Sequence, residues 1–107
     1  MKEKDYILDS IKETLKHVMP PDAKVILFGS QAQGNAHVNS DWDILILLNK
    51  IKIEHTDFDN VAYPLMELGW NIGAEINPIL YTHEDWKKRN FTPFYKNVMQ
   101  QGIELWH

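Results

Sequence analysis

Gly29 and Ser30 have the types and the position to bind a phosphate. They end an apolar run and open a turn, where glycine lets backbone N–H groups approach an anion closely. If Ser30 begins a short helix through Gly34, its unpaired N–H groups and its dipole also favour a phosphate. The sequence therefore predicts a phosphate cradle at this turn, to which Ser30 can add a hydroxyl donor.

Two aspartates follow this turn after ten residues, in the order Asp41-Trp42-Asp43. Side chains two residues apart in a strand project from the same face, so both carboxylates point together. Paired carboxylates repel each other unless a cation lies between them, and such hard oxygen ligands suit Mg²⁺ or Mn²⁺. A phosphate turn beside this pair predicts a metal-triphosphate site.

Hydrophobic periodicity and turn residues indicate the elements that position these groups. Lys24–Phe28 is a short apolar run, and residues 41–48 form a second one that becomes apolar on both faces. Both runs are typical of buried strands. Apolar residues in segment 5–18 recur every three to four positions, which predicts a helix that the pair Pro20-Pro21 ends.

The spacing of apolar residues in segment 56–68 predicts a further helix. Thr56 with Asp59 is the expected capping pair at its start, because a hydroxyl and a carboxylate three residues apart suit the first turn. Gly69 is the expected cap at its end. The chain therefore leaves this helix before the third apolar run begins.

Residues 74–81 predict a third strand, which must lie at a sheet edge or carry a bulge because Pro78 cannot donate a hydrogen bond. Thr82 then opens a short helix, and Thr92-Pro93 a last one. The alternation of helices and strands predicts a small mixed β-sheet backed by helices, in the α+β or α/β class. One domain over residues 1–107 is expected.

Composition excludes several classes of protein. The 107 residues are 44% hydrophobic and 24% charged, as in ordinary globular proteins, and they contain no cysteine for a disulfide or a thiolate metal site. The net charge of −4 argues against binding to nucleic acid, which needs a basic face. No segment has the length of a signal peptide or a membrane span, so we expect a cytoplasmic protein.

The stretch FGSQAQGNAHVNSDWDILILL, residues 28–48, resembles the minimal nucleotidyltransferases of the DNA polymerase β-like superfamily. The hallmark of that family is a Gly-Ser turn followed by a strand with the D-x-D pattern. The segments EINPILYTHEDWKKR and FYKNVMQQGIELW are similar to the usual C-terminal part of these short proteins. The resemblance covers essentially the whole chain and implies the polymerase β-like palm fold.

The resemblance also implies roles for individual residues. Gly29 and Ser30 would hold the β- and γ-phosphates, while Asp41 and Asp43 would bind two divalent cations, Mg²⁺ or Mn²⁺. A third carboxylate on a later strand would complete the metal site and help to accept a proton, and Glu75 is the residue expected there. Two metals about 3.5–4 Å apart would then stabilise an in-line displacement, with pyrophosphate leaving and a nucleoside monophosphate transferred to a hydroxyl.

Such single-domain proteins resemble the antitoxin of toxin–antitoxin pairs, whose partner is a helical HEPN-type protein. The expected reaction is transfer of AMP from ATP to a tyrosine of that partner. The short chain agrees with this, because little of it remains to form an acceptor pocket. Transfer to a small molecule such as an aminoglycoside, or to an RNA end, is a further alternative, although those relatives usually carry extra domains.

Two residues depart from the family pattern. Many members carry Arg where this chain has Gln33, so the phosphate site loses a fixed positive charge. Many have Asp at the third acidic position, where Glu75 is longer by one methylene, and Asn77 on the same face is an alternative occupant. These departures support a second hypothesis, in which the chain is a weak or inactive nucleotide-binding module that acts by binding a HEPN-type partner.

Overall fold

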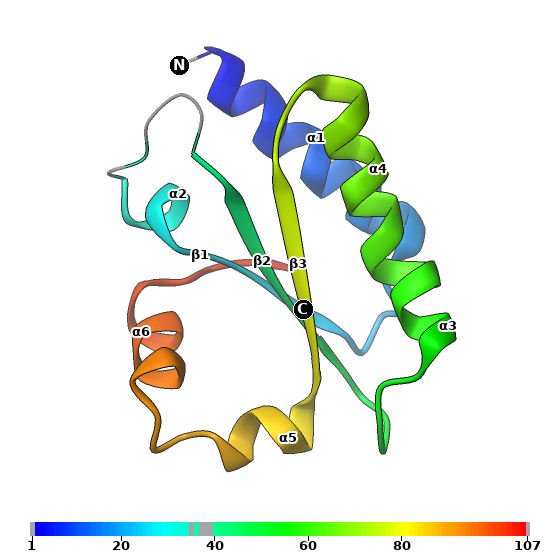
Figure 1. Ribbon diagram of the computed structural model, residues 1–107, viewed down its shortest axis with the longest axis vertical. Helices are drawn as coiled ribbons and strands as arrows, with labels where there is room; N and C mark the ends of the chain where they lie inside the picture. The colour runs from blue at the N-terminus through cyan, green and yellow to red at the C-terminus, as the bar shows by residue number, and fades with distance from the viewer. Residues whose placement is uncertain (1, 35, 37–39, 107) are drawn as a thin grey trace.

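The computed structural model describes residues 2–34, 36 and 40–106 (Figure 1). Its elements, in chain order, are α1 (Lys2–Val18), β1 (Lys24–Phe28), α2 (Ser30–Gln33), β2 (Trp42–Leu48), α3 (His55–Asp57), the π-helical turn η1 (Phe58–Ala62), α4 (Tyr63–Ile72), β3 (Ile76–Thr82), α5 (His83–Lys88), α6 (Pro93–Gln101) and β4 (Ile103–Trp106). Among the described helices, none is both long and apolar enough to cross a lipid bilayer.

The four strands form one mixed sheet in the order β3-β2-β1-β4. β1 pairs antiparallel with both β2 and β4, whereas β2 and β3 run parallel. In this register Phe28 lies opposite Asp43 on β2, and Asp43 lies opposite Asn77 on β3. The sheet therefore brings the end of β1 and the starts of β2 and β3 together.

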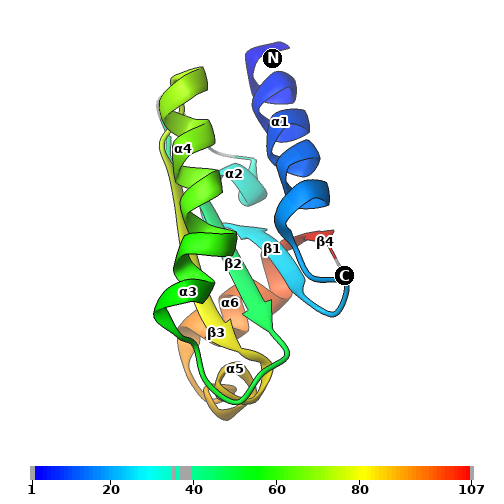
Figure 2. The same ribbon diagram turned by 90° about the vertical axis from the view of Figure 1, so that its right-hand side faces the viewer.

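One face of the sheet is closed by α1 and α4, which lie side by side across it (Figure 2). Ile44 and Ile46 of β2 point into this layer and are fully buried. Ile11 and Leu15 of α1 and Leu65 of α4 meet them there without any exposure. Apolar burial at this face is the main force that holds the two helices on the sheet.

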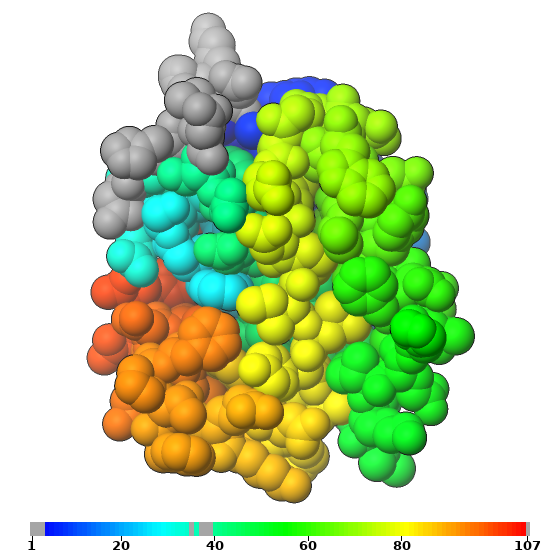
Figure 3. Space-filling model, in the orientation of Figure 1, coloured from blue at the N-terminus to red at the C-terminus, as the bar shows by residue number. Residues whose placement is uncertain are grey.

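The opposite face is covered over only part of its length, by α5 and α6. Leu45 and Leu47 of β2 pack there against Trp86 of α5 and Val98 of α6. Asp43 is next on this same face of β2, and it is only partly buried. Figure 3 shows that atoms of α2 and of the start of β2 reach the surface between β3 and α6.

The mixed sheet with helical backing that the sequence predicts is confirmed, and so are the first two strands. β3 lies at the sheet edge, as the sequence predicts. An edge strand tolerates Pro78, because one side of such a strand has no neighbour that needs a hydrogen-bond donor. Thr82 caps α5 by accepting a hydrogen bond from Asp85 N at 3.0 Å, and Thr92 caps α6 in the same way.

Two expectations about helix ends were wrong. The helix predicted over residues 56–68 has Glu54 as its N-cap. Glu54 N donates a 2.7 Å hydrogen bond to Asp57 Oδ2, which completes a capping box. Thr56 and Asp59 are therefore not the capping pair. The helix ends at Gly73, which has a φ of 76°, and not at Gly69. Gly69 is buried within the helix, where a Cβ would lie 2.5 Å from the oxygen of Ala74.

Strand β4 was not predicted. Its residues Ile103–Trp106 are too few to show an alternating pattern, and they pair with β1 across an irregularity between Val25 and Ile26. The salt bridge between Lys24 Nζ and Glu104 Oε2, at 2.9 Å, joins the two strands. β4 places the end of α6 beside β1, close to the phosphate turn.

Candidate functional site

The predicted phosphate turn has the backbone of a tight strand-to-helix corner. Gly29 adopts φ 80° and ψ −160°, a combination that is essentially restricted to glycine. Ser30 then begins helix α2, as expected, and Gly34 ends it with a φ of 80°. Ala32 N and Gln33 N donate hydrogen bonds to Gly29 O at 3.1 and 3.2 Å. The N–H groups that remain available to an anion at this corner are therefore those of Ser30 and Gln31.

Gly29 lies directly against the carboxylate of Asp43. A Cβ built at Gly29 would collide with Asp43 Oδ2, so only glycine allows the turn and the carboxylate to come this close. The antiparallel register explains the contact, because Phe28 just before the turn is the partner of Asp43. A ligand that rests on the turn therefore also meets a carboxylate.

Asp41 and Asp43 share a face with Asn77, which the parallel β2–β3 register brings opposite Asp43. Asn77 Nδ2 donates a hydrogen bond of 3.1 Å to Asp41 Oδ2. Burial raises the pKa of the Asp43 carboxyl above 3.8, an effect that the hydrogen bond from Asn77 opposes and the charge of Asp41 reinforces. A carboxylate under these conditions gains from a nearby cation.

The third carboxylate of the sequence prediction does not join this pair. Glu75 precedes β3, and its side chain is exposed, while its carbonyl oxygen accepts a 2.8 Å hydrogen bond from Trp42 N. Within the described part of the chain, no three acidic, histidine or cysteine side chains gather into a metal-binding group. The group beside Asp41 is the carboxamide of Asn77, so a three-carboxylate set is not formed in this structure.

Gln31 is a residue of the site that sequence reasoning missed. Its side chain is 7% exposed, and its Nε2 donates a 3.2 Å hydrogen bond to the carbonyl oxygen of Ser40, just before Asp41. This bond ties α2 to the start of the aspartate strand. A glutamine in a four-residue helix usually faces solvent, so no sequence signal indicated a buried role.

The residues present fit a divalent cation that is shared with a phosphate ligand. Mg²⁺ usually takes one or two carboxylates and completes its shell with water and substrate phosphates, and Asp41 and Asp43 supply that number. Burial is the main cause of the raised pKa of Asp43, and the charge of Asp41 adds to it, so a bound cation would stabilise the ionised form of this carboxyl. The turn at Gly29 would place phosphate oxygens beside the same pair.

Comparison with known proteins agrees with this geometry. Residues 7–102 match the family described as the nucleotidyltransferase domain, which is most of the chain. A candidate protein adenylyltransferase of Methanocaldococcus jannaschii is 36% identical over 83 residues, which cover 78% of this chain and 77% of that relative.

Solved structures show the same fold at lower identity. A toxin–antitoxin structure with AMP-PNP superposes with a TM-score of 0.62 at 22% identity, covering 92% of this chain and 72% of that one. A structure of the tri-AMPylated HEPN toxin of Shewanella oneidensis with its MNT antitoxin gives a TM-score of 0.57 at 17% identity, covering 96% and 71%. At such identities the likeness concerns the fold.

Proposed function

The chain belongs to the nucleotidyltransferase domain family, and from this membership we propose that it transfers AMP from ATP to a hydroxyl of a helical, HEPN-type partner protein. The observation that carries the proposal is the contact between the glycine of the turn and the carboxylate of Asp43. The relative named as a protein adenylyltransferase and the structure of a toxin with its antitoxin support the choice of nucleotide and acceptor.

In this proposal the residues of the site have separate tasks. The N–H groups that follow Gly29 and the hydroxyl of Ser30 hold the phosphates, and Asp41 with Asp43 holds the divalent ions. Bound Mg²⁺ or Mn²⁺ supplies positive charge for the triphosphate and lowers the pKa of the attacking hydroxyl. Asn77 fixes the orientation of Asp41 through its hydrogen bond.

The reaction is an in-line displacement at the α-phosphorus. The acceptor oxygen forms a new bond to that phosphorus while the bond to the oxygen bridging to the β-phosphate breaks, and pyrophosphate leaves. The hydroxyl proton must be released, and the carboxylates of this face are the nearest acceptors within the described site. Glu75 keeps the role of third ligand only if its exposed side chain turns toward the pair when the nucleotide binds.

A second candidate function is nucleotide binding without transfer. It is favoured by the position of Asn77, which occupies the place beside Asp41 where a third carboxylate would stand. Gln33 also lies at the turn without a positive charge. Such a protein would act on its HEPN-type partner through binding alone.

Transfer of label decides between the two functions. The protein is incubated with Mg²⁺, α-³²P-labelled ATP and a helical, HEPN-type protein, and the label on that protein is measured. We expect transfer by the unaltered protein and by Asp59→Asn, an exposed carboxylate on η1, but a loss of about 10³-fold for Asp43→Asn. Tight binding of Mg-ATP with no transfer by any of the three proteins would establish the binding function instead.

A further inference from the structure

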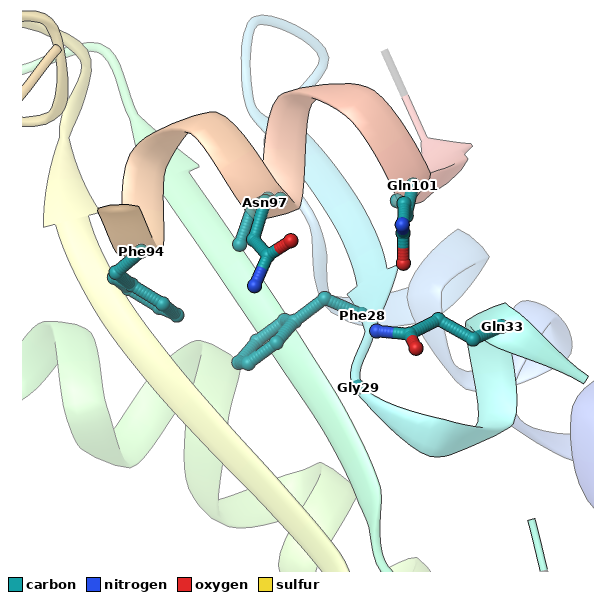
Figure 4. Close-up of a pocket in the computed structure, with 8 residues that line it drawn as sticks. Phe28, Gly29, Gln33, Phe94, Asn97 and Gln101 are labelled. Atoms are coloured by element: carbon teal, nitrogen blue, oxygen red, sulfur yellow. The ribbon is translucent and has the colours of Figure 1, made fainter. Parts of the chain in front are cut away.

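A small pocket lies between the phosphate turn and helix α6, on the side of Gly29 that faces α6 (Figure 4). Its volume is about 130 Å³, and its lining comes from the end of β1, from α2 and from α6. A cavity of about 150 Å³ in another protein takes up benzene, so this pocket has the size for one aromatic ring system and not for a whole nucleotide.

The floor of the pocket is aromatic and held in place. The rings of Phe28 and Phe94 meet edge to face, with centroids 5.4 Å apart and planes at 73°. Phe94 in turn meets the buried ring of Trp86 at 5.5 Å and 85°. These contacts give a flat ligand a fixed apolar surface to pack on.

The rim of the pocket carries three carboxamides, those of Gln33, Asn97 and Gln101, which converge above Phe28 and Gly29 (Figure 4). None of them has a hydrogen-bond partner among the residues that the structure describes, so their donors and acceptors are available to a ligand. Among the residues that the structure describes, no charged side chain lines the pocket. Neutral lining of this kind suits a neutral ring better than a phosphate, which charged donors favour.

Carboxamides distinguish the two purine bases at the edge that carries N7. A carboxamide offers one donor group and one acceptor, and adenine presents an acceptor at N7 beside a donor at N6. Guanine presents two acceptors on the same edge, so a carboxamide satisfies only one of them. An aromatic floor with carboxamides at the rim is thus complementary to adenine.

We propose that this pocket binds the base of the nucleoside triphosphate, with adenine preferred, and that Asn97 and Gln101 of α6 read its edge. The inference rests on the proposed function, because it places the base beside the turn that holds the phosphates. It makes helix α6 a source of nucleotide selectivity. This helix lies about seventy residues from the Gly-Ser motif in the sequence.

Equilibrium binding with base-free and base-containing ligands tests the proposal. Dissociation constants are measured with Mg²⁺ for ATP, GTP and inorganic tripolyphosphate, using the unaltered protein and the double variant Asn97→Ala/Gln101→Ala. We expect the variant to bind ATP about 10-fold more weakly and to lose its preference over GTP, because two hydrogen bonds are removed. Its affinity for tripolyphosphate should stay the same.

The matched control is Gln100→Ala, which removes an exposed glutamine of the same helix that does not line the pocket. Equal weakening of tripolyphosphate and ATP in the double variant would make this a phosphate pocket and overturn the proposal. Unchanged ATP binding, or no preference for ATP in the unaltered protein, would place the base elsewhere. Failure of the unaltered protein to bind any of the three ligands would instead remove the proposed function itself, and this inference with it.

Discussion

The two faces of the sheet use the same strands for different purposes. The face under α1 and α4 is apolar along β1 and β2, and Ile44 and Ile46 are fully buried there. The face under α5 and α6 is apolar only where those helices cover it, at Leu45 and Leu47. Beyond the helices it turns polar, at Asp43 and Asn77.

The difference shows how a short chain combines a stable core with an open site. Successive residues of β2 point to opposite faces, so one strand contributes to the closed core and to the carboxylate pair at once. The closed face supplies the burial that stabilises the fold. The open end of the other face holds Asp43 against Gly29. Partial burial of the Asp43 carboxylate lowers the stability of the fold, but it places the carboxylate beside the turn where a ligand would bind.

The largest effect that this comparison predicts is on stability, at one isoleucine on each face of the sheet. Ile44 is 0% exposed under α1 and α4, whereas Ile79 is 38% exposed on the open face. Ile44→Ala should lower the free energy of unfolding by about 2–5 kcal/mol, because it leaves a cavity in a closed core. Ile79→Ala should cost about 1 kcal/mol or less.

Denaturant unfolding of both variants at equal protein concentration provides the measurement. Similar losses for Ile44→Ala and Ile79→Ala would mean that the two faces are covered alike, which would contradict the description of an open site.

A smaller effect is expected at the glycines that flank α2. Gly29 and Gly34 both have a φ of 80°, but a Cβ at Gly34 meets no atom of the described residues within 4 Å, while one at Gly29 meets Asp43. Gly34→Ala should therefore cost only backbone strain, about 1 kcal/mol. Gly29→Ala should cost about 1–2 kcal/mol more and should also weaken triphosphate binding.

The two variants are compared by thermal or denaturant unfolding and by titration with Mg-ATP. If Gly34→Ala weakens triphosphate binding as much as Gly29→Ala does, the contact with Asp43 is not the reason that the turn needs glycine.

The smallest effect concerns pH and separates Asp43 from Asp57, an aspartate outside the site. Burial raises the pKa of the Asp43 carboxyl above 3.8, so its folded form binds the proton more tightly than its unfolded form. Loss of this proton therefore lowers the free energy of unfolding as the pH rises from 3.8 through the pKa of Asp43 in the folded protein. Hydrogen bonds from Lys50 Nζ, at 2.8 Å to each oxygen, lower the pKa of Asp57 below 3.8, and its contribution is lost as pH falls through that lower value.

Unfolding curves measured between acidic and neutral pH, without divalent ions, should show opposite signs for the two variants. Asp43→Asn should be more stable than the unaltered protein at neutral pH, with the difference disappearing below pH 3.8. Asp57→Asn should be less stable at neutral pH, with the difference shrinking in acid. A destabilised Asp43→Asn at neutral pH would contradict the raised pKa.

Signals from residues close together in the sequence were enough to predict much of the fold and the backbone of the Gly29-Ser30 turn. The apolar runs and turn residues gave β1, β2 and the Gly29-Ser30 corner, because those signals are local. The short strand β4 and the buried role of Gln31 could not be found in this way, since both depend on segments that meet only in the folded chain.

The same distinction applies to the third position of the metal site and to the pocket beside α6. Sequence alone left Glu75 and Asn77 as alternatives, because both would project from one face of the strand expected over residues 74–81. The hydrogen bond between Asn77 and Asp41 depends on the parallel register of β2 and β3. The carboxamides of α6 are spaced like those of any solvent-facing helix, and only the tertiary structure places them over Phe28.

The most direct test of the central claim, that the Gly29 turn and the aspartate pair form one metal-triphosphate site, is the effect of Mg²⁺ on nucleotide affinity. Binding of a non-hydrolysable ATP analogue is measured by calorimetry with and without Mg²⁺ for the unaltered protein, Asp43→Asn and the control Asp59→Asn. We predict that Mg²⁺ strengthens binding about 10-fold or more in the unaltered protein and the control, but about twofold or less in Asp43→Asn, which should bind the metal-free analogue at least as well. An undiminished Mg²⁺ effect in Asp43→Asn would show that the carboxylate beside Gly29 takes no part in the site.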